Sequence, residues 1–359
     1  MPKPLRISLR VIACLLAIVL LAALAYVAYV VFSYSRIPDY QPLAPEGEAS
    51  ALAQTGRAYT VVTQNLGFGA YTPSFTFFMD GGVGSRAESP ESVRSCVEEG
   101  ARTVAALSPD FVFFQEVDID SDRSYHIDER TLLSPFFEGC ASAFAQNYHS
   151  AYLFYPFYEP HGASQSGLLT VSRLAVSQAS RRSLPISEGF SKFLDLDRCY
   201  SVSRVPCENG KELVLFNVHL SAYGGSDEIR TAQMTQLLSD MQAEFEKGNY
   251  AVCGGDFNHD FTGHSTQDLN GGESVDFGWA QPFPDDLLAQ TGCVRRADGY
   301  QTLVPTCRNC DVPYQEGNFT IIVDGFLVTE NVEILSVQNV DTRFSYSDHN
   351  PAVLQFLLK

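Results

Sequence analysis

The feature that most restricts how this chain can fold is an unbroken apolar run over residues 11–32. At 1.5 Å per residue, a helix of this length crosses the roughly 30 Å hydrocarbon layer of a bilayer. The run follows three cations: Lys3, Arg6 and Arg10. Because cations that flank a membrane helix stay in the cytoplasm, we expect a cytoplasmic segment 1–10 and a single-pass transmembrane signal-anchor 11–32. The remainder would then lie outside the cytoplasm, attached to the cell membrane.

A cleavable signal peptide is the alternative interpretation of this region. Ala23-Leu24-Ala25 has the small-x-small form of a cleavage site. Residues 26–32 nevertheless continue the apolar run beyond that point. The total apolar length therefore favours an anchor that is retained.

The part of the chain outside the membrane is strongly acidic. The whole chain has 24 Lys and Arg against 42 Asp and Glu, which gives a net charge of −18. Without the three N-terminal cations, 21 cations face the same 42 anions, and the charge becomes −21. Because phosphate backbones and anionic lipids are bound by clustered cations, this composition argues against a broad binding surface for either. It leaves room for a local metal site, where the ion itself supplies positive charge.

Cysteine usage permits disulfides without specifying them. One of the nine cysteines, Cys14, lies in the apolar run, so eight remain outside the membrane. An even number of thiols in an oxidising compartment is compatible with a disulfide framework. Cys307 and Cys310 form a CxxC pair, but no second pair accompanies it as a zinc site would require. A local disulfide or two free thiols is the favoured interpretation.

Residues 33–57 are expected to form a linker between the membrane and a folded domain. They contain Pro38, Pro42 and Pro45 and lack apolar periodicity. No second break in composition and no internal repeat follows them. We therefore expect one catalytic domain over residues 58–359.

Apolar strand-like runs and helical patterns alternate within that domain. The predicted strands cover residues 59–63, 111–115, 167–176, 202–206, 212–220, 250–254, 319–329, 332–337 and 352–357. One helix is predicted to begin at Ser89-Pro90, and another to run from Ser226 to Gly248. Buried strands that alternate with helices predict an α/β fold in which helices cover the sheets.

Polar residues of similar chemistry follow several of these strands. They occur in the segments TQN at 63–65, QE at 115–116, NVHL at 217–220, GDFN at 255–258, VDGF at 323–326 and SDHNP at 347–351. Oxygen ligands suit a hard divalent cation, and phosphate-ester hydrolysis also needs a base for water and donors for the phosphate oxygens. Strand ends are also where a ligand crevice forms in layered α/β proteins. The set therefore predicts metal-assisted hydrolysis of a phosphate ester.

Each of these residues has a structural explanation when taken alone. An Asp at a strand end is usually a turn residue or a helix cap, and Asn65 before Leu-Gly suits a turn. His219 between Val and Leu is more often a buried structural histidine. The functional prediction depends on the joint occurrence of all of them.

Together with SGLLTVSR at 166–173 and VDGFLVT at 323–329, these motifs resemble the endonuclease/exonuclease/phosphatase superfamily. Its members include DNase I-like nucleases, abasic endonucleases, sphingomyelinases and inositol-polyphosphate 5-phosphatases. GDFN followed by SDHNP is the specific part, and the resemblance extends over about residues 59–358. It implies a four-layer α/β sandwich of two mixed β-sheets flanked by helices, with the site at one edge.

The resemblance implies catalytic roles for five residues. Asp256 would orient or deprotonate the attacking water, and Asn258 would hold a phosphate oxygen. His219 would donate a hydrogen bond to the phosphate. His349, paired with Asp324, would stabilise the pentacovalent transition state, because a carboxylate favours the imidazolium form.

It also implies ligands for a metal and for the substrate. Asn65 and Glu116 would hold Mg²⁺, with Mn²⁺ or Ca²⁺ as alternatives, and Asp348 would bind the same or a second ion. His161 is placed where relatives have a phosphate-contacting side chain. Arg173 is either a phosphate contact or a buried structural arginine.

Three further segments lie near these motifs in the sequence. The segment 78–82, followed by Arg86, is placed where relatives bring substrate-contacting loops. Residues 118–126 could shape a substrate pocket, but a polar loop is the favoured interpretation. His259 is expected only to adjoin the site.

The sequence therefore favours a membrane-anchored phosphohydrolase outside the cytoplasm, with a phospholipid head group or a small organophosphate as substrate. Segment 193–198 resembles sphingomyelinase-type and uncharacterised bacterial members more than abasic endonucleases, and attachment to the membrane would suit a lipid or a phosphorylated head group. An extracellular DNase I-like endonuclease is the alternative, with nucleic acid as substrate only. A catalytically inactive binding module is less favoured because no residue of the set is lost. No protein partner is inferred.

Overall fold

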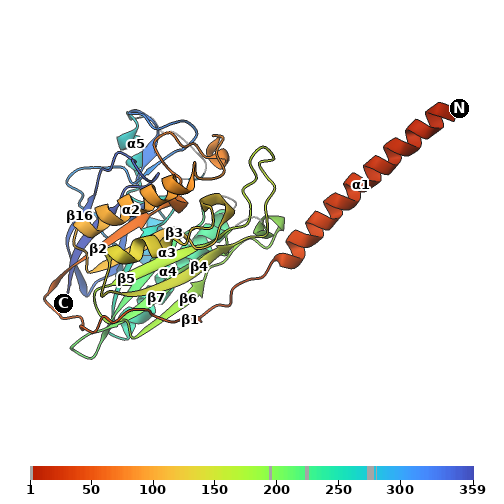
Figure 1. Cartoon of the computed structure of the whole chain (residues 1–359). Coiled ribbons are helices and arrows are strands. Elements are labelled where there is room, and N and C mark those ends of the chain that lie inside the picture. The colour runs from red at the N-terminus through yellow and green to blue at the C-terminus, as the bar shows by residue number, and fades with distance from the viewer. Residues whose placement is uncertain (1–2, 194–195, 223–225, 273–278, 280) are drawn as a thin grey trace.

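Two mixed β-sheets pack face to face in the computed structural model of this chain, and a long N-terminal helix extends away from them (Figure 1). The structure describes residues 3–193, 196–222, 226–272, 279 and 281–359. Residues 1–2 of the expected cytoplasmic segment, and Leu194 and Asp195 of the sphingomyelinase-like segment, lie outside the described residues.

The first sheet has seven strands, of which β8 and β9 are parallel and all other neighbours are antiparallel. In spatial order these are β1 (Gln41–Leu43), β6 (Gln178–Ser183), β7 (Cys199–Pro206), β8 (Glu212–His219), β9 (Tyr250–Asp256), β15 (Asp324–Thr329) and β12 (Val294–Arg296).

The second sheet has six strands, of which β2 and β3 are parallel and the others antiparallel. In spatial order these are β16 (Val332–Asn339), β17 (Ala352–Leu358), β2 (Ala58–Asn65), β3 (Phe111–Asp118), β5 (Gln165–Ser172) and β4 (Ala141–His149). Two short pairs complete the strands: β10 (His259–Asp260) with β11 (Gln281–Pro282), and β13 (Cys307–Arg308) with β14 (Thr320–Ile321).

In the sequence the helices alternate with the strands, and the two longest helices of the domain cover the outer faces of the sheets. The α-helices are α1 (Lys3–Ser33), α2 (Pro90–Ala106), α3 (Glu129–Leu133), α4 (Asp227–Glu246), α5 (Ser265–Leu269) and α6 (Asp285–Thr291). The 3₁₀ helices are η1 (Gly67–Gly69), η2 (Phe78–Asp80), η3 (Asp122–Ser124), η4 (Ser134–Phe136) and η5 (Phe190–Phe193).

Alternation along the strands produces the four layers. In β8, Leu213 and Leu215 face the other sheet in a core shared with β2, whereas Val214 and Phe216 face α4. In β2, Val61 joins the core between the sheets, and Val62 packs on the α2 side. Successive strand residues point to opposite faces, so each sheet buries one face on its partner and the other under helices. The predicted four-layer α/β sandwich is confirmed.

The two predicted helices of the domain are present. Ser89 caps α2 by accepting a hydrogen bond from the Ser92 amide, with Pro90 in the first turn. Helix α4 ends before Gly248, whose φ of +79° is a left-handed conformation that suits glycine. Their apolar stripes pack on opposite outer faces of the sandwich, as the periodicity predicts.

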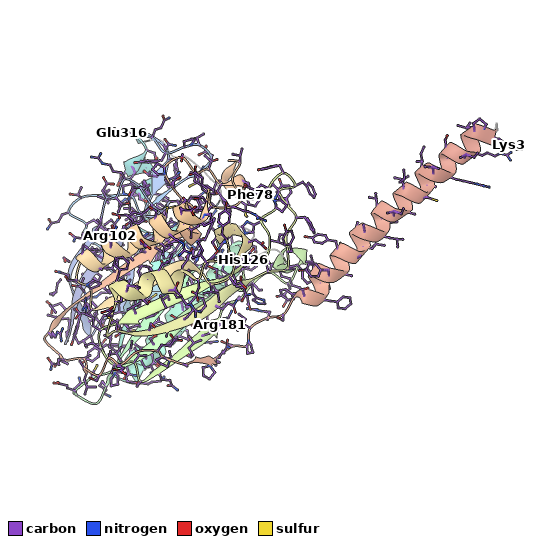
Figure 2. All side chains as sticks on the ribbon, in the orientation of Figure 1. Lys3, Phe78, Arg102, His126, Arg181 and Glu316 are labelled. Atoms are coloured by element: carbon purple, nitrogen blue, oxygen red, sulfur yellow. The ribbon has the colours of Figure 1, made fainter. Side chains whose placement is uncertain are left out.

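Helix α1 is long and apolar enough to cross a membrane. Its 31 residues correspond to about 46 Å, and Val30 is its buried residue. Figure 2 shows its side chains on all sides of a helix that extends away from the domain, and nearly all of them are exposed. In water such a helix would expose a large apolar surface, so its composition fits a lipid environment.

Several predicted elements differ from the observed ones. The expected linker 33–57 contributes β1, which pairs with β6. The run 167–176 ends as a strand at Ser172, and the run 319–329 divides into β14 and β15, which belong to different sheets. Strands β4 and β6 are not predicted, because short or polar side chains leave them with a weak apolar pattern.

Candidate active site

The site lies at one edge of the sandwich because of how four strands are oriented. Strands β8 and β9 are parallel and end together, with His219 paired to Asp256. Asp324 begins β15 instead of ending a strand, but β15 is antiparallel to β9, so Asp324 also pairs with Asp256. His349 precedes β17, which is antiparallel to β2 and therefore starts where β2 ends. Strand starts and strand ends thus meet at a single edge.

Glu116 is turned into the site by a β-bulge. The pairing of β3 with β5 shifts register between Phe114 and Val117, and Glu116 has a φ of +53°. A left-handed backbone is unfavourable for a residue with a side chain and is maintained by its surroundings. Bulges re-aim side chains near active sites, and this one directs Glu116 into a pocket of about 160 Å³.

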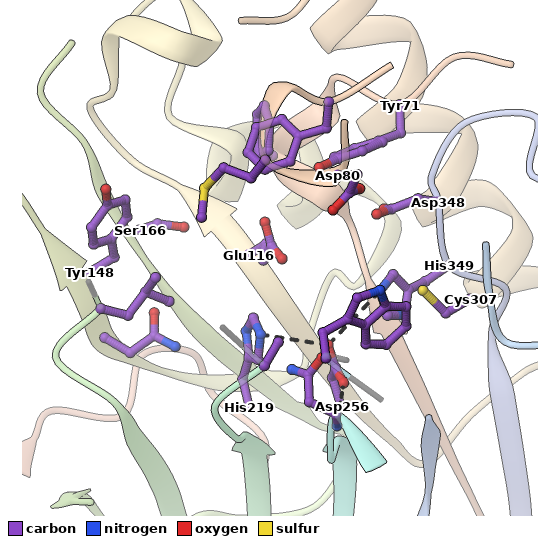
Figure 3. A pocket seen from close by; sticks show the side chains of 18 of the residues that line it. Tyr71, Asp80, Glu116, Tyr148, Ser166, His219, Asp256, Cys307, Asp348 and His349 are labelled. Atoms are coloured by element: carbon purple, nitrogen blue, oxygen red, sulfur yellow. Dashed lines mark hydrogen bonds and ion pairs between the residues drawn. The ribbon is translucent and has the colours of Figure 1, made fainter. Parts of the chain in front are cut away.

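Asp256 lies at the centre of a buried charge cluster at the floor of this pocket (Figure 3). Its Oδ2 is 3.5 Å from Nε2 of His219 and 3.9 Å from Nε2 of His349. Burial raises the pKa of Asp256 to about 7. The positive charge of His349 lowers this pKa, but the negative charge of Asp324 raises it and so opposes His349. A carboxyl group with a pKa in this range exchanges protons readily near neutral pH.

His349 is held in its orientation by Asp324. The Nδ1 atom of His349 donates a hydrogen bond to Oδ2 of Asp324 at 2.7 Å, and both side chains are buried. Burial alone would lower the pKa of His349, but the Asp324 carboxylate raises it well above its usual value. His349 is therefore an imidazolium at neutral pH, with Nε2 on the Asp256 side.

His219 is the opposite case. Burial lowers its pKa well below the usual value, and the nearby charges of Arg198 and His349 lower it further. Its imidazole is therefore neutral at physiological pH. Within the described residues, the buried Nδ1 atom of His219 has no hydrogen-bond partner.

A second group of carboxylates lines the opposite side of the pocket. Figure 3 shows Glu116, Asp80 and Asp348 turned toward a common space. Burial raises the pKa of Asp348 to about 7; His349 opposes this, while Glu116 and Asp80 add to it. Glu116 and Asp80 lie close enough to raise the pKa of Asp348, so the three carboxylates form a site of high negative potential, and hard divalent cations take oxygen ligands of this kind.

The two amides of the predicted set support the carboxylates. Asn65 Nδ2 donates to Oε1 of Glu116 at 3.3 Å and to Oδ2 of Asp256 at 3.1 Å. Asn258, with a φ of +50°, donates its backbone N–H to Oδ1 of Asp256 at 2.9 Å and lines the pocket. Asn65 thus connects the carboxylate at the bulge with the one on the pocket floor.

The structure separates the two expected substrate contacts. His161 lines the pocket, and its Nδ1 is 3.1 Å from the Ser85 carbonyl. Arg173 is exposed and donates to the Pro109 carbonyl at 2.7 Å. Because Ser172 pairs with Phe111, the start of β3, Arg173 lies at the end of the sheet remote from Glu116. The structure thus does not place Arg173 in the pocket, nor does it bury it.

Four predictions about neighbouring segments can be compared with the structure. Segment 118–126 is expected to be a polar loop, but part of it is buried. Arg123 and Asp118 form a buried ion pair at 2.8 Å, and Arg123 lines the pocket. Asp80, in segment 78–82, also lines it. His259 is buried but does not line the pocket. Among the described cysteines all thiols are free, those of the CxxC pair included.

Sequence reasoning gave no role in the pocket to two of its buried arginines, Arg198, which ends the sphingomyelinase-like segment 193–198, and Arg308. Nε of Arg198, and both Nε and Nη1 of Arg308, have no hydrogen-bond partner among the described residues. Buried guanidinium groups with unused donors suit an anionic ligand. Neither the DLDR end of that segment nor TCRN at 306–309 has a spacing that indicates a phosphate contact, so only the fold places the two guanidinium groups in the pocket.

Asp256, Asp324 and His349 have ligand atoms within 4.8 Å of one another. The short contact between Asp324 and His349 engages the imidazole in a hydrogen bond, so this trio is an acid–base group. Glu116, Asp80 and Asp348 offer only oxygen atoms and fit a divalent cation better.

Comparison with known proteins agrees with this arrangement. The model of the Endonuclease/Exonuclease/phosphatase family matches residues 63–349. Comparison with curated protein sequences finds no match.

Solved structures share the fold at low sequence identity. An endonuclease/exonuclease/phosphatase from Beutenbergia cavernae is 18% identical over 84% of this chain and 72% of its own, with a TM-score of 0.56. A counterpart from Bacteroides vulgatus is 15% identical over 84% and 100%, with a TM-score of 0.53. ANGEL2, described as a 2',3'-cyclic phosphatase, is 12% identical over 88% and 98%, also with a TM-score of 0.53. The chain therefore belongs to the endonuclease/exonuclease/phosphatase family, a class of metal-dependent phosphoric ester hydrolases.

Proposed function

We propose that this protein is a membrane-anchored, extracytoplasmic, Mg²⁺-dependent phosphohydrolase that cleaves a phosphodiester or a phosphomonoester by attack of water. The observation that carries the proposal is the convergence of Asp256, His219 and the Asp324–His349 pair in one pocket. Opposite them lie Glu116 and Asp348, the proposed ligands of the cation together with Asn65.

In the proposed mechanism Asp256 accepts a proton from the attacking water. Its position in reach of two imidazoles and the Asn258 amide fixes the direction in which the carboxylate points. His349, positively charged beside Asp324, neutralises the charge that develops on the phosphorus-bound oxygens. His219 and Asn258 provide neutral hydrogen-bond donors to the same oxygens. A bound divalent cation supplies Lewis-acid charge stabilisation at the carboxylate side of the pocket.

The substrate favoured by this proposal is a phospholipid head group or a small organophosphate. The net charge of −18 disfavours electrostatic capture of a long polyanion, whereas the buried arginines suit a single phosphate. The alternative is an extracellular DNase I-like nuclease; its support is the fold shared with ANGEL2, solved with adenosine-2',3'-vanadate.

A substrate panel tests the proposal. The full-length chain in phosphatidylcholine nanodiscs with Mg²⁺ is assayed on sphingomyelin, inositol phosphates, DNA, RNA and a chromogenic phosphodiester. We expect EDTA-sensitive turnover of at least one of them, and a decrease in kcat of about 10²–10⁴-fold for Asp256→Asn. Equal, EDTA-insensitive background on every substrate would show that the assignment as a hydrolase is wrong.

A further inference from the structure

A loop between β4 and β5 exposes an unusual concentration of aromatic rings. We call residues 152–158, with the sequence Tyr-Leu-Phe-Tyr-Pro-Phe-Tyr, the aromatic loop. The exposed fractions of its side chains reach 48% for Phe154, 64% for Tyr155, 83% for Phe157 and 68% for Tyr158. Contiguous exposed apolar surface of this kind normally marks a contact with a partner or a lipid phase.

The aromatic loop is held by specific contacts, so its exposure is built into the fold. Leu153 and Gly162 exchange two backbone hydrogen bonds of 3.1 and 3.0 Å at its base. The Tyr158 hydroxyl donates to the Val83 carbonyl at 2.7 Å, and the Tyr155 ring packs edge-on against Phe78 with centroids 5.8 Å apart. These contacts fix the position of the loop, so its aromatic rings are exposed in a defined arrangement.

The aromatic loop lies against the C-terminal end of α1 (Figure 1). The Tyr26 hydroxyl donates to the Tyr152 carbonyl at 3.1 Å, and the Tyr152 amide donates to the Tyr29 hydroxyl at 3.1 Å. The rings of Tyr26 and Phe154 meet edge-on with centroids 5.2 Å apart. These contacts connect the loop to the only described helix that can cross a membrane.

The depth of this contact follows from helix geometry. Tyr26 lies six residues before the end of the apolar run at Phe32, which is about 9 Å along the helix axis at 1.5 Å per residue. Amphipathic segments at a membrane surface bury their apolar face about 5–10 Å below the head groups. With α1 in a bilayer, the aromatic loop would therefore lie at the level of the outer interface.

The composition of the loop fits that level. Tyr and Trp rings gather at membrane interfaces because they combine an apolar body with a polar edge. Residues 150–158 contain no Asp, Glu, Lys or Arg, although the chain as a whole carries −18. An uncharged aromatic surface on an acidic protein suits zwitterionic lipids over anionic ones.

We propose that the aromatic loop inserts into the outer interface of the bilayer that α1 crosses and holds the pocket against the head-group layer. This inference rests on the proposed membrane anchoring. His161, three residues beyond the loop, lines the pocket, as does Met79, next to the Phe78 that packs on Tyr155. The loop and the pocket wall are thus continuous, so the ester in reach is the head-group phosphate of a zwitterionic outer-leaflet lipid.

Fluorescence quenching by brominated lipid tests the insertion. Phe157→Trp places a reporter at the most exposed ring of the loop, and Tyr158→Trp provides a second. The matched control is Leu335→Trp, a 44% exposed side chain on β16, which lies on the side of the domain away from α1 (Figure 1). The full-length variants are placed in nanodiscs of plain or acyl-brominated phosphatidylcholine. The signal of the native Trp279 is subtracted with the wild-type protein.

We expect bromine to quench the residue-157 and residue-158 reporters by at least twofold and to leave the residue-335 reporter unchanged. A blue shift of the loop reporters without quenching would indicate that protein covers the loop, and would overturn the inference. So would solvent-like emission in both nanodiscs. Failure of the protein to enter nanodiscs at all would instead contradict the proposed anchoring, so the two failures are distinguishable.

Discussion

At the scale of single residues, the site depends on backbone conformations that are unfavourable elsewhere. Glu116 and Asn258 both have positive φ, and both belong to the pocket. Such residues cost on the order of 1–3 kcal/mol each, which the surrounding structure must offset. Their presence in the pocket that Asp256 lines indicates that this edge of the sandwich is shaped for chemistry at some cost in stability.

A substitution of Asp324 tests whether this carboxylate acts by orienting and charging His349. Asp324→Asn removes the carboxylate that raises the pKa of His349, so the imidazole becomes neutral at pH 7. We expect kcat to decrease about 100-fold with KM changed less than threefold, as for loss of a group that orients and charges a catalytic histidine. NMR titration should show a lower pKa for His349.

The matched control for this variant is Asp341→Asn, an exposed carboxylate on the same C-terminal segment. It should leave both kcat and the His349 titration unchanged. Wild-type kcat in Asp324→Asn, with a folded protein by circular dichroism, would contradict the proposed role of the pair.

At the scale of elements, the approach of β9 to β8 requires a glycine at position 255. Gly255 has a φ of +145°, and a Cβ there would lie 2.1 Å from the Val218 carbonyl oxygen. Gly255→Ala would push apart the strands that carry His219 and Asp256. We expect a decrease in Tm of about 10 °C or more, or failure to fold. Gly210→Ala, at a turn where nothing lies within 4 Å, should lower Tm far less; equal effects would refute the packing argument.

An ion pair between Glu244 of α4 and Arg204 of β7 joins the helix to the sheet, and the pKa of Glu244 is well below its usual value. Glu244 accepts hydrogen bonds from Arg204, Lys247 and Asn249. Although burial opposes it, these bonds lower the pKa of Glu244 to about 2. Since the folded-state pKa lies below the unfolded value of about 4.5, this stabilisation is present above pH 4.5 and is lost as the pH falls toward 2.

Glu244→Gln should therefore reduce the free energy of unfolding at pH 7 by about 1–3 kcal/mol. The difference from wild type should shrink steadily between pH 5 and pH 3, as urea unfolding at several pH values will show. Glu246→Gln, an exposed residue of the same helix, should change stability by less than about 0.5 kcal/mol at every pH. A pH-independent difference for Glu244→Gln would exclude the titration as its cause.

At the scale of the whole molecule, a cation bound at the carboxylate side of the pocket should stabilise the fold. Glu116 comes from β3 and Asp348 from the segment before β17, two strands of the second sheet, and Asp80 comes from η2, so the cation would join segments far apart in the sequence. Binding to the native state alone at 100 times Kd adds about 2.7 kcal/mol. For a domain of this size we expect Mg²⁺ to raise Tm by about 5 °C, and EDTA to reverse it.

Two controls separate this effect from general ionic strength. NaCl at the same ionic strength should not raise Tm, and Glu116→Gln should abolish the Mg²⁺ shift while leaving the metal-free protein folded. An unchanged shift in Glu116→Gln would place the cation elsewhere.

Two buried amides show what local patterns leave out. Gln115 and Asn217 precede Glu116 and His219 in their strands, and Gln115 donates to Asn217 at 2.7 Å across the two sheets. Both amides are fully buried and satisfied. The sequence shows each as a polar residue in an apolar run, but their pairing depends on a packing of sheets that no local pattern encodes.

The sequence alone determined the alternation of buried strands and helices and the motif residues at strand boundaries, because periodicity and turn chemistry are local. The four-layer class followed from the resemblance of those motifs to a known family. Tertiary structure alone decided which of them meet. It brought Asp80, Arg198 and Arg308 into the pocket and left Arg173 at the far end of β5. It also seated the aromatic loop against α1. Contacts between residues more than a hundred positions apart depend on strand direction and register, and these are set by the packing of the whole sandwich.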